Sequence, residues 1–171
     1  GEAEVIDYLR FASRAFLFTA SSVPAALGAA LAALRIVRSE EGRDLLAAVL
    51  ANAERFARGL EALGFRVQTG APVRTGPAAD APTQAIRTPI IPVLVGDDWK
   101  AALLWRALYD AGIFTNCAIH PAVPPGGALL RTSVMATHDG ATLDRALEIF
   151  AAVKRDFEAE HGPLPGPADA A

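Results

Sequence analysis

The feature that most constrains the fold of this chain is a long helical repeat of apolar residues that leads directly into a strand pattern. From Ser39 to Leu63, apolar residues recur at the three- and four-residue spacing of one helix face. Gly64 is suited to end this helix, and Phe65–Gln68 then alternates apolar and polar residues. A helix with one apolar stripe must pack against a second layer. The stripe comprises Leu45, Leu46, Val49, Leu50, Ala53, Phe56 and Leu60.

Strand and helix patterns alternate through the rest of the chain. Ile90–Val95 is apolar and β-branched, and Pro92 within it predicts a sheet edge or a bulge, because proline has no N–H for a central ladder. Leu129–Met135 alternates apolar and polar residues, as a strand with one wet face does. A helix is predicted at Trp99–Asp110, with Gly96-Asp97-Asp98 as its cap and Gly112 at its end. A strand follows at Ile113–Asn116. The last predicted helix is capped by Thr137-His138-Asp139, and its apolar stripe consists of Leu143, Leu147, Phe150 and Val153.

The first forty residues are predicted to be helical and to contain a hydroxyl-rich turn. Glu4–Phe11 has a short amphipathic pattern. Pro24 suits the first turn of a second helix, which continues to about Val37. This second helix is built from Ala and Leu with Gly28, so we expect it to be buried on most sides.

The order of these elements predicts an α/β protein of the α+β type. We expect a small mixed sheet, mainly antiparallel, with helices packed on one face. Residues 69–88 and 121–127 read as loops, because Gly, Pro and Asp interrupt any periodicity. Residues 162–171 are rich in Pro, Gly and Ala, and we expect them to be a disordered tail.

Composition narrows the classes of function. Acidic and basic residues are interspersed and the net charge is −3, which disfavours a nucleic-acid or anionic-membrane partner. The most apolar stretch, Val23–Val37, contains Arg35 and is shorter than the roughly 20 apolar residues of a membrane helix. The single cysteine, Cys117, cannot form an internal disulfide and fits a reducing cytoplasm. No metal-ligand spacing and no phosphate loop is present, so we expect no metal site.

Two places in the sequence could bind an anion. Arg131 interrupts an otherwise apolar strand, and its guanidinium fork matches a carboxylate, either of a substrate or of a protein acid in a structural ion pair. The third interpretation is that Arg131 simply lies on an exposed strand face. Thr19 and Ser21 lie where a helix begins, which suits anion binding and ordinary capping equally. His120 and His138 could exchange protons near neutral pH, or could be loop and capping residues.

Five segments, in their order and spacing, resemble the C-terminal half of the α-oxoamine synthases. They are Ser13–Ser21, Thr88–Val93, Gly112–Asn116, Pro121–Pro125 and Leu130–His138. This family includes 8-amino-7-oxononanoate synthase, glycine C-acetyltransferase, 5-aminolevulinate synthase and serine palmitoyltransferase, within the class I/II aminotransferase superfamily. The sequence Met-Ala-Thr-His at the end of the last segment is most similar to the serine palmitoyltransferase and glycine acetyltransferase branch.

The resemblance implies an enzyme that uses pyridoxal 5′-phosphate (PLP). Such an enzyme condenses an amino acid with an acyl thioester, on CoA or a carrier protein, and releases the carboxylate to leave an α-aminoketone. It implies a cytoplasmic homodimer whose active sites lie at the subunit interface. Residues 1–38 would end the large PLP domain and link it onward, residues 39–160 would form the small C-terminal domain, and residues 161–171 would be the tail.

The resemblance also assigns roles to four residues. Arg131 matches the arginine that holds the amino-acid carboxylate. His120 stands nearest to a second substrate-binding arginine that family members carry before the Pro-rich loop, with one residue fewer between it and Arg131. Thr19 and Ser21 match the turn whose hydroxyls reach the cofactor phosphate of the neighbouring subunit.

The resemblance further implies that the lysine that attaches PLP lies upstream of Gly1, because Lys100 and Lys154 match no cofactor motif. We therefore expect no catalytic residue in this chain and no activity from it alone. Two alternatives remain. One is a class I/II aminotransferase fragment, in which Arg131 would hold the same carboxylate. The other is a non-catalytic domain that dimerises through the Ala-rich helix beginning at Pro24.

Overall fold

A computed structural model describes residues 1–20, 22–68 and 88–166 of the chain. The predicted loop at residues 69–88 therefore lies almost wholly outside the described residues. The chain divides into two compact units, residues 1–43 and residues 44–171. Each unit has its own pattern of burial.

The first unit consists of short helices whose side chains stay exposed. The helices predicted at Glu4–Phe11 and from Pro24 onward are confirmed, and a single helical turn lies between them. No residue of these three helices is buried. The expectation that the Ala-rich helix is buried on most sides is wrong for this unit, in which every residue of that helix is exposed. The three helices are α1 (Ala3–Ala12), α2 (Arg14–Leu17) and α3 (Pro24–Val37).

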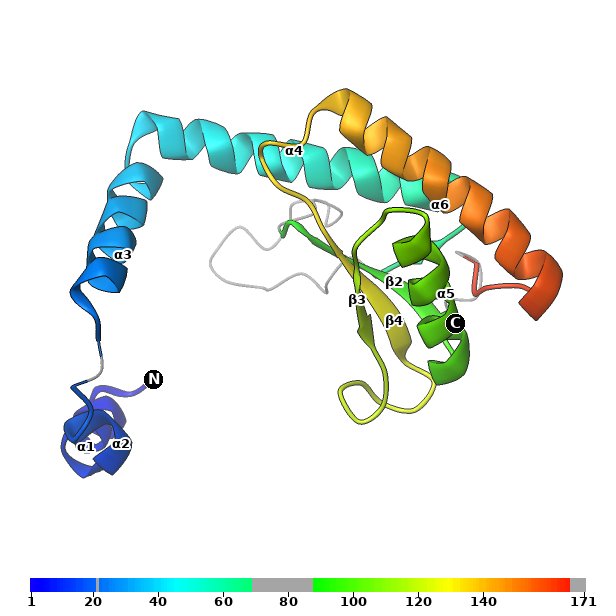
Figure 1. The fold of residues 1–171 in the computed structure, drawn as a ribbon. Coiled ribbons are helices and arrows are strands. Elements are labelled where there is room, and N and C mark those ends of the chain that lie inside the picture. The colour runs from blue at the N-terminus through cyan, green and yellow to red at the C-terminus, as the bar shows by residue number, and fades with distance from the viewer. Residues whose placement is uncertain (21, 69–87, 167–171) are drawn as a thin grey trace, which may run out of the picture. The chain divides into compact units, whose positions relative to one another are not determined.

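The second unit is a two-layer sandwich of a sheet and three helices (Figure 1). Its four strands are ordered β1-β2-β4-β3, and every neighbouring pair is antiparallel. The predicted fold class, an antiparallel sheet with helices on one face, is confirmed. The strands are β1 (Arg66–Val67), β2 (Ile90–Gly96), β3 (Asn116–Ala118) and β4 (Ala128–Ser133), and the helices are α4 (Glu40–Ala62), α5 (Asp98–Asp110) and α6 (Gly140–His161).

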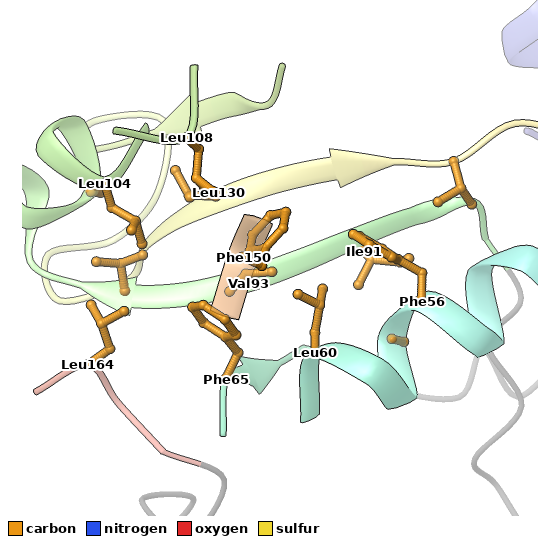
Figure 2. Packing of buried hydrophobic residues seen from close by; sticks show 14 of the residues in the cluster. Phe56, Leu60, Phe65, Ile91, Val93, Leu104, Leu108, Leu130, Phe150 and Leu164 are labelled. Carbon is orange, nitrogen blue, oxygen red and sulfur yellow. The ribbon is translucent and has the colours of Figure 1, made fainter. Parts of the chain in front are cut away.

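The core lies between the helices and one face of the sheet (Figure 2). Phe150 of α6 is fully buried and meets Phe56 and Phe65 edge to face, at ring-centroid distances of 5.8 and 5.6 Å. The strands contribute the residues of one parity, including Val93 and Leu130, which are direct neighbours in the sheet. Alternation along a strand therefore leaves the opposite parity on a second face, away from the helices.

Pro92 lies in a central strand, so the predicted sheet edge is wrong. β2 pairs with β1 on one side and β4 on the other. The Pro92 carbonyl accepts a hydrogen bond from the backbone N–H of Gln68, just beyond the end of β1. In an antiparallel pair the backbone N and C=O of a residue point to the same neighbouring strand. The nitrogen of Pro92, which carries no hydrogen, therefore points to the place where β1 has ended, and no ladder bond of β1 is lost. The register irregularity of β2 lies further on, between Leu94 and Gly96.

The strand predicted at Ile113–Asn116 instead begins at Asn116 and ends at Ala118. Residues 113–115 leave α5 without pairing in the sheet. The backbone N–H of Ile113 donates to the Leu108 carbonyl, and the Thr115 carbonyl accepts from Nε1 of Trp105 at 3.0 Å. These bonds to α5 satisfy the backbone groups that a strand would otherwise use.

The ends of the helices in the second unit follow the predicted capping. Asp97 accepts from the Lys100 N–H at the start of α5, and Asp139 accepts from the Thr142 N–H at the start of α6. Gly64 follows α4 with a φ of 78°, the left-handed conformation that glycine tolerates. After α6, Leu164 is buried in the core, so the chain is held in place beyond His161.

Candidate functional site

Arg131 lies on the face of the sheet that the helices leave open. It occupies β4 between Leu130 and Thr132, both of which point into the core. The alternation of the strand turns Arg131 to the opposite face, where it is exposed. The cross-strand register sets Pro92 of β2 on one side of it and Asn116 of β3 on the other.

The guanidinium of Arg131 has no hydrogen bond and no ion pair with any residue that the structure describes. Most other arginines of this unit do have one; Arg55, for example, meets Asp144 at 2.7 Å. The described residues provide no structural ion pair for Arg131, so a ligand and a plain exposed strand face are the two interpretations that stay open. Asn116 is its cross-strand neighbour, with Cβ atoms about 4.5–5.5 Å apart in such pairs. A guanidinium beside an amide can donate several hydrogen bonds to one carboxylate.

His120 lies beyond the end of β3 and not opposite Arg131. Its backbone N–H donates to the Asp98 carboxylate at 3.3 Å, and its bond to Pro121 is cis. The side chain is exposed and has no partner among the described residues. The register gives the place beside Arg131 to Asn116, four residues earlier. A substrate-binding role for His120 stays a prediction.

His138 is part of the turn that leads from β4 into α6. Its Nδ1 accepts a hydrogen bond from the Met135 N–H at 3.3 Å, and its carbonyl accepts from the Asn52 side chain at 2.8 Å. It therefore has the capping role that was one of its two interpretations. Because Nδ1 is an acceptor, the proton of the neutral ring is on Nε2.

The hydroxyl turn belongs to the first unit, whereas Arg131 belongs to the second. Thr19 is exposed, and its hydroxyl donates to the Ala15 carbonyl one turn back along the chain. Ser21 lies outside the described residues. The phosphate-binding role expected of both residues stays a prediction.

Both lysines of the chain hold structural hydrogen bonds. Nζ of Lys154 donates to the Leu63 carbonyl at 2.8 Å and lies 4.9 Å from the centre of the Phe65 ring. Nζ of Lys100 donates to the Pro163 carbonyl at 3.3 Å. Lys154 thus ties α6 to the end of α4, and Lys100 ties α5 to the segment that follows α6.

The thiol of Cys117 faces the core from β3. Burial raises the pKa of Cys117, and the negative charge of Asp98 raises it further. A thiol with a raised pKa is a poor nucleophile at neutral pH. Cys117 therefore acts as a small packing residue beside Leu130.

Comparison with known proteins identifies the family to which this chain belongs. Residues 1–150 match the family model for aminotransferase class I and II. The chain belongs to the class I and II aminotransferase family. Among relatives in this family, a serine palmitoyltransferase from Bacteriovorax stolpii is 35% identical over 158 residues, which cover 92% of this chain. An 8-amino-7-oxononanoate synthase from Geotalea daltonii is 38% identical over 152 residues, or 89% of this chain.

Solved structures agree with these class I and II relatives. An SPT structure that contains PLP matches 89% of this chain with a TM-score of 0.73 and 30% identity. An 8-amino-7-oxononanoate synthase from Francisella tularensis shares the fold, with a TM-score of 0.60 and 21% identity. The resemblance predicted from the sequence motifs is confirmed. The chain spans about a third of the length of the curated relatives it matches, 33% and 35% for the two above.

Asn116 is the residue of this site that sequence reasoning missed. Its place beside Arg131 depends on the register between β3 and β4, which the sequence pattern does not specify for so short a strand. The predicted strand at residues 113–116 had the wrong bounds, because β3 is Asn116–Ala118. The only available signal was that a polar amide precedes the apolar pair Cys117 and Ala118.

Two further features, a cluster of metal ligands and a membrane-spanning helix, are absent from the described part of the chain. It holds no group of three or more His, Cys, Asp or Glu side chains that could bind a metal ion. None of its helices is long and apolar enough to cross a membrane.

Proposed function

We propose that this chain is the carboxylate-anchoring part of a PLP-dependent acyltransferase of the α-oxoamine synthase type. The complete enzyme would condense an amino acid with an acyl thioester and release the carboxylate to form an α-aminoketone. The single observation that carries the proposal is the unpartnered guanidinium of Arg131 on the open sheet face of a class I and II family member. The names of the relatives, serine palmitoyltransferase and 8-amino-7-oxononanoate synthase, support the acyltransfer chemistry.

In this proposal Arg131 binds and orients the substrate. Two parallel N–H donors of its fork hold the carboxylate, which fixes the rotation of the amino acid about its α-carbon. The amide of Asn116, its cross-strand neighbour, can donate a further hydrogen bond. Pro92 on the other side has no charged or donor group to compete for the anion.

The residues present fit part of a PLP site. Thr19 is exposed and its hydroxyl can turn from the Ala15 carbonyl to a phosphate oxygen, with Ser21 two residues on. When bound, PLP supplies an electron sink for bond breaking at the α-carbon of the amino acid. Both lysines of this chain already hold backbone carbonyls. The attaching lysine would therefore be a residue outside this chain, and the chain alone would be inactive.

We place the active enzyme in the cytoplasm as a homodimer, with the hydroxyl turn of one subunit serving the site of the other. The thioester would be acyl-CoA or an acyl carrier, and His120 would contact the substrate from the Pro-rich loop. The raised pKa of Cys117 agrees with a cysteine that plays no part in the chemistry.

The test uses the protein translated from its whole reading frame. Steady-state rates of thiol release from an acyl-CoA would be measured with serine, glycine and alanine, together with the visible absorbance of bound PLP. Arg131→Gln should lower kcat/KM for the amino acid at least about 100-fold, because a charge-assisted bidentate contact is worth roughly 3 kcal/mol. Arg131→Lys should recover part of that loss, since lysine keeps the charge and loses the fork.

Arg145→Gln is the matched control. Arg145 is also exposed and without an ion pair among the described residues, and it lies on α6, outside the sheet. Its replacement should leave kcat/KM unchanged. Equal losses for the two variants would argue against carboxylate binding by Arg131. Amino transfer to a keto acid, with no thiol release, would instead identify an aminotransferase.

A further inference from the structure

The second unit has a pocket on the helix side of the sheet, whereas Arg131 lies on the opposite face. It has a volume of about 270 Å³ and opens between the end of β4, the exit of α5 and the first turns of α6. Phe56, Ile113 and Phe150 are among its apolar walls. Small-ligand pockets start at about 300 Å³, and an apolar cavity of about 150 Å³ already holds benzene. The space therefore suits one ring with a short substituent.

One hydroxyl in this pocket is buried and unsatisfied. Thr115 is 3% exposed, and its Oγ1 has no hydrogen-bond partner among the described residues. Its backbone is held, because its carbonyl accepts from Trp105 Nε1. An unpaired buried hydroxyl costs roughly 1–3 kcal/mol, and protein interiors seldom keep one without a reason. Thr132, the other buried threonine, has no such deficit, since its hydroxyl donates to the Ile91 carbonyl at 2.7 Å.

A second donor lines the same pocket. His138 accepts the Met135 N–H at Nδ1, which leaves the proton on Nε2. No described residue bonds to that nitrogen. Thr115 and His138 thus both line the pocket, and each has a donor group, O–H or N–H, that no described residue bonds. The Thr115 hydroxyl is enclosed in this structure, so it reaches an occupant by rotation about the Cα–Cβ bond. The complementary ligand group is an acceptor.

The absence of charged residues from the pocket lining indicates whether the acceptor group of the ligand is charged or neutral. No Lys, Arg, Asp or Glu is among the residues that line it. A carboxylate would enter without a cation to pair with, and an ammonium would enter without an anion, and both losses of hydration are costly. A neutral carbonyl oxygen can take both donors at a far smaller cost. Its apolar body would lie against the phenylalanines.

We propose that this pocket binds a small neutral molecule that combines an apolar ring or short chain with a carbonyl oxygen, held by Thr115 and His138. The site is independent of the substrate anchor, because Thr132 and Arg131 on adjacent positions of β4 face opposite sides of the sheet. Its occupant would contact residues 132–134 directly after Arg131 in the chain.

The test is a binding titration of the 171-residue chain, followed by the amide signals of ¹⁵N-labelled protein in NMR spectra. Acetophenone is the probe, and ethylbenzene, of the same shape without the oxygen, is its partner. Acetophenone should shift the signals of Thr115 and His138 saturably and bind several-fold tighter than ethylbenzene. Thr115→Val should lower the acetophenone affinity about five-fold, the worth of one neutral hydrogen bond, and leave ethylbenzene binding unchanged.

Thr137→Val is the matched control, because Thr137 is exposed and does not line the pocket. It should bind both probes like the parent chain. Retained ethylbenzene binding shows that the pocket of Thr115→Val is intact, so a folding defect is distinguished from a lost contact. Equal acetophenone affinities for Thr115→Val and the parent chain would overturn the proposal. Tighter binding of benzoate or 1-phenylethylamine than of acetophenone would overturn the neutral ligand class.

Discussion

The two units of this chain are both rich in helix, yet they differ in what their helices pack against. Phe11 of α1 is 80% exposed, whereas Phe150 of α6 is 0% exposed. Neither α1, α2 nor α3 begins with a side-chain cap, whereas α5 and α6 each begin with a capping aspartate. Helix formation depends on local sequence, but burial depends on a second layer, and only residues 44–171 contain one.

The same contrast appears along a single helix. The apolar stripe of α4 is continuous in sequence, but its early members Leu45 and Leu46 are exposed while Phe56 and Leu60 are buried. The sheet and α6 cover only the later turns. A sequence stripe thus indicates which face can be buried, and the neighbouring elements decide how much of it is.

Removing one phenylalanine from each unit should give the largest difference. Phe150→Ala should lower the free energy of unfolding by about 3–5 kcal/mol, because it leaves a cavity between Phe56 and Phe65. Phe11→Ala should change it by less than about 0.5 kcal/mol. Urea unfolding followed by circular dichroism measures both. Similar losses would mean that α1 has a packed environment after all.

The two lysines give the next contrast. Lys154→Met removes a donor from the Leu63 carbonyl, and the side chain of Lys154 is only 15% exposed, so stability should fall by about 1–3 kcal/mol. Lys100→Met, the matched control, should cost less, because its bond to Pro163 is longer and exposed. Thermal unfolding of the two variants compares them. An unchanged Tm for Lys154→Met would argue against its structural role.

Two helical glycines should respond with opposite signs. A Cβ at Gly59 of α4 would overlap Cδ1 of Leu147, so Gly59→Ala should lower stability by about 1 kcal/mol despite the better helix propensity of alanine. Gly28 of α3 has nothing within 4 Å of that position, so Gly28→Ala should raise helicity. Urea unfolding for the first and far-ultraviolet circular dichroism for the second are the readouts. A destabilising Gly28→Ala would reveal a close neighbour of α3.

The smallest expected effect is a loss of stability at low pH through the carboxyl group of Asp139. Hydrogen bonds from Thr142, from its side chain and then its backbone, lower the pKa of Asp139. A carboxylate with a lowered folded-state pKa contributes stability that is present above its unfolded value and is lost as pH falls through the folded one. Stability should therefore decline below about pH 4, and Asp139→Asn should flatten that decline while keeping the cap. Urea midpoints between pH 2 and 6 measure it; an unchanged slope would exclude Asp139 as a contributor.

The sequence predicted the helices and the buried strands because their periodicity is long and regular. It failed where tertiary contacts compete with local pattern. Pro92 is tolerated in a central strand because β1 stops beside it, and residues 113–115 bond to α5 instead of joining the sheet. Neither partner is visible in the local sequence.

For the site, the sequence identified Arg131 through its charge in an apolar strand, a signal that is local. Asn116 beside Arg131 and the unsatisfied hydroxyl of Thr115 gave no such signal. Both depend on which element faces them, and the local sequence does not show that. The failed expectation that α3 is buried has a similar cause. Its composition matches that of a core helix, but no residue of α3 is buried in its unit.

Amide hydrogen exchange of the 171-residue chain at low concentration tests the central contrast most directly. We predict strong protection in β2, β4, α5, α6 and the second half of α4, where the backbone bonds lie around one core. We predict exchange close to that of a free peptide in α1, α2 and α3, which bury no residue. Protection of α3 equal to that of α6 would contradict the account, because it would mean that the first unit has a core of its own.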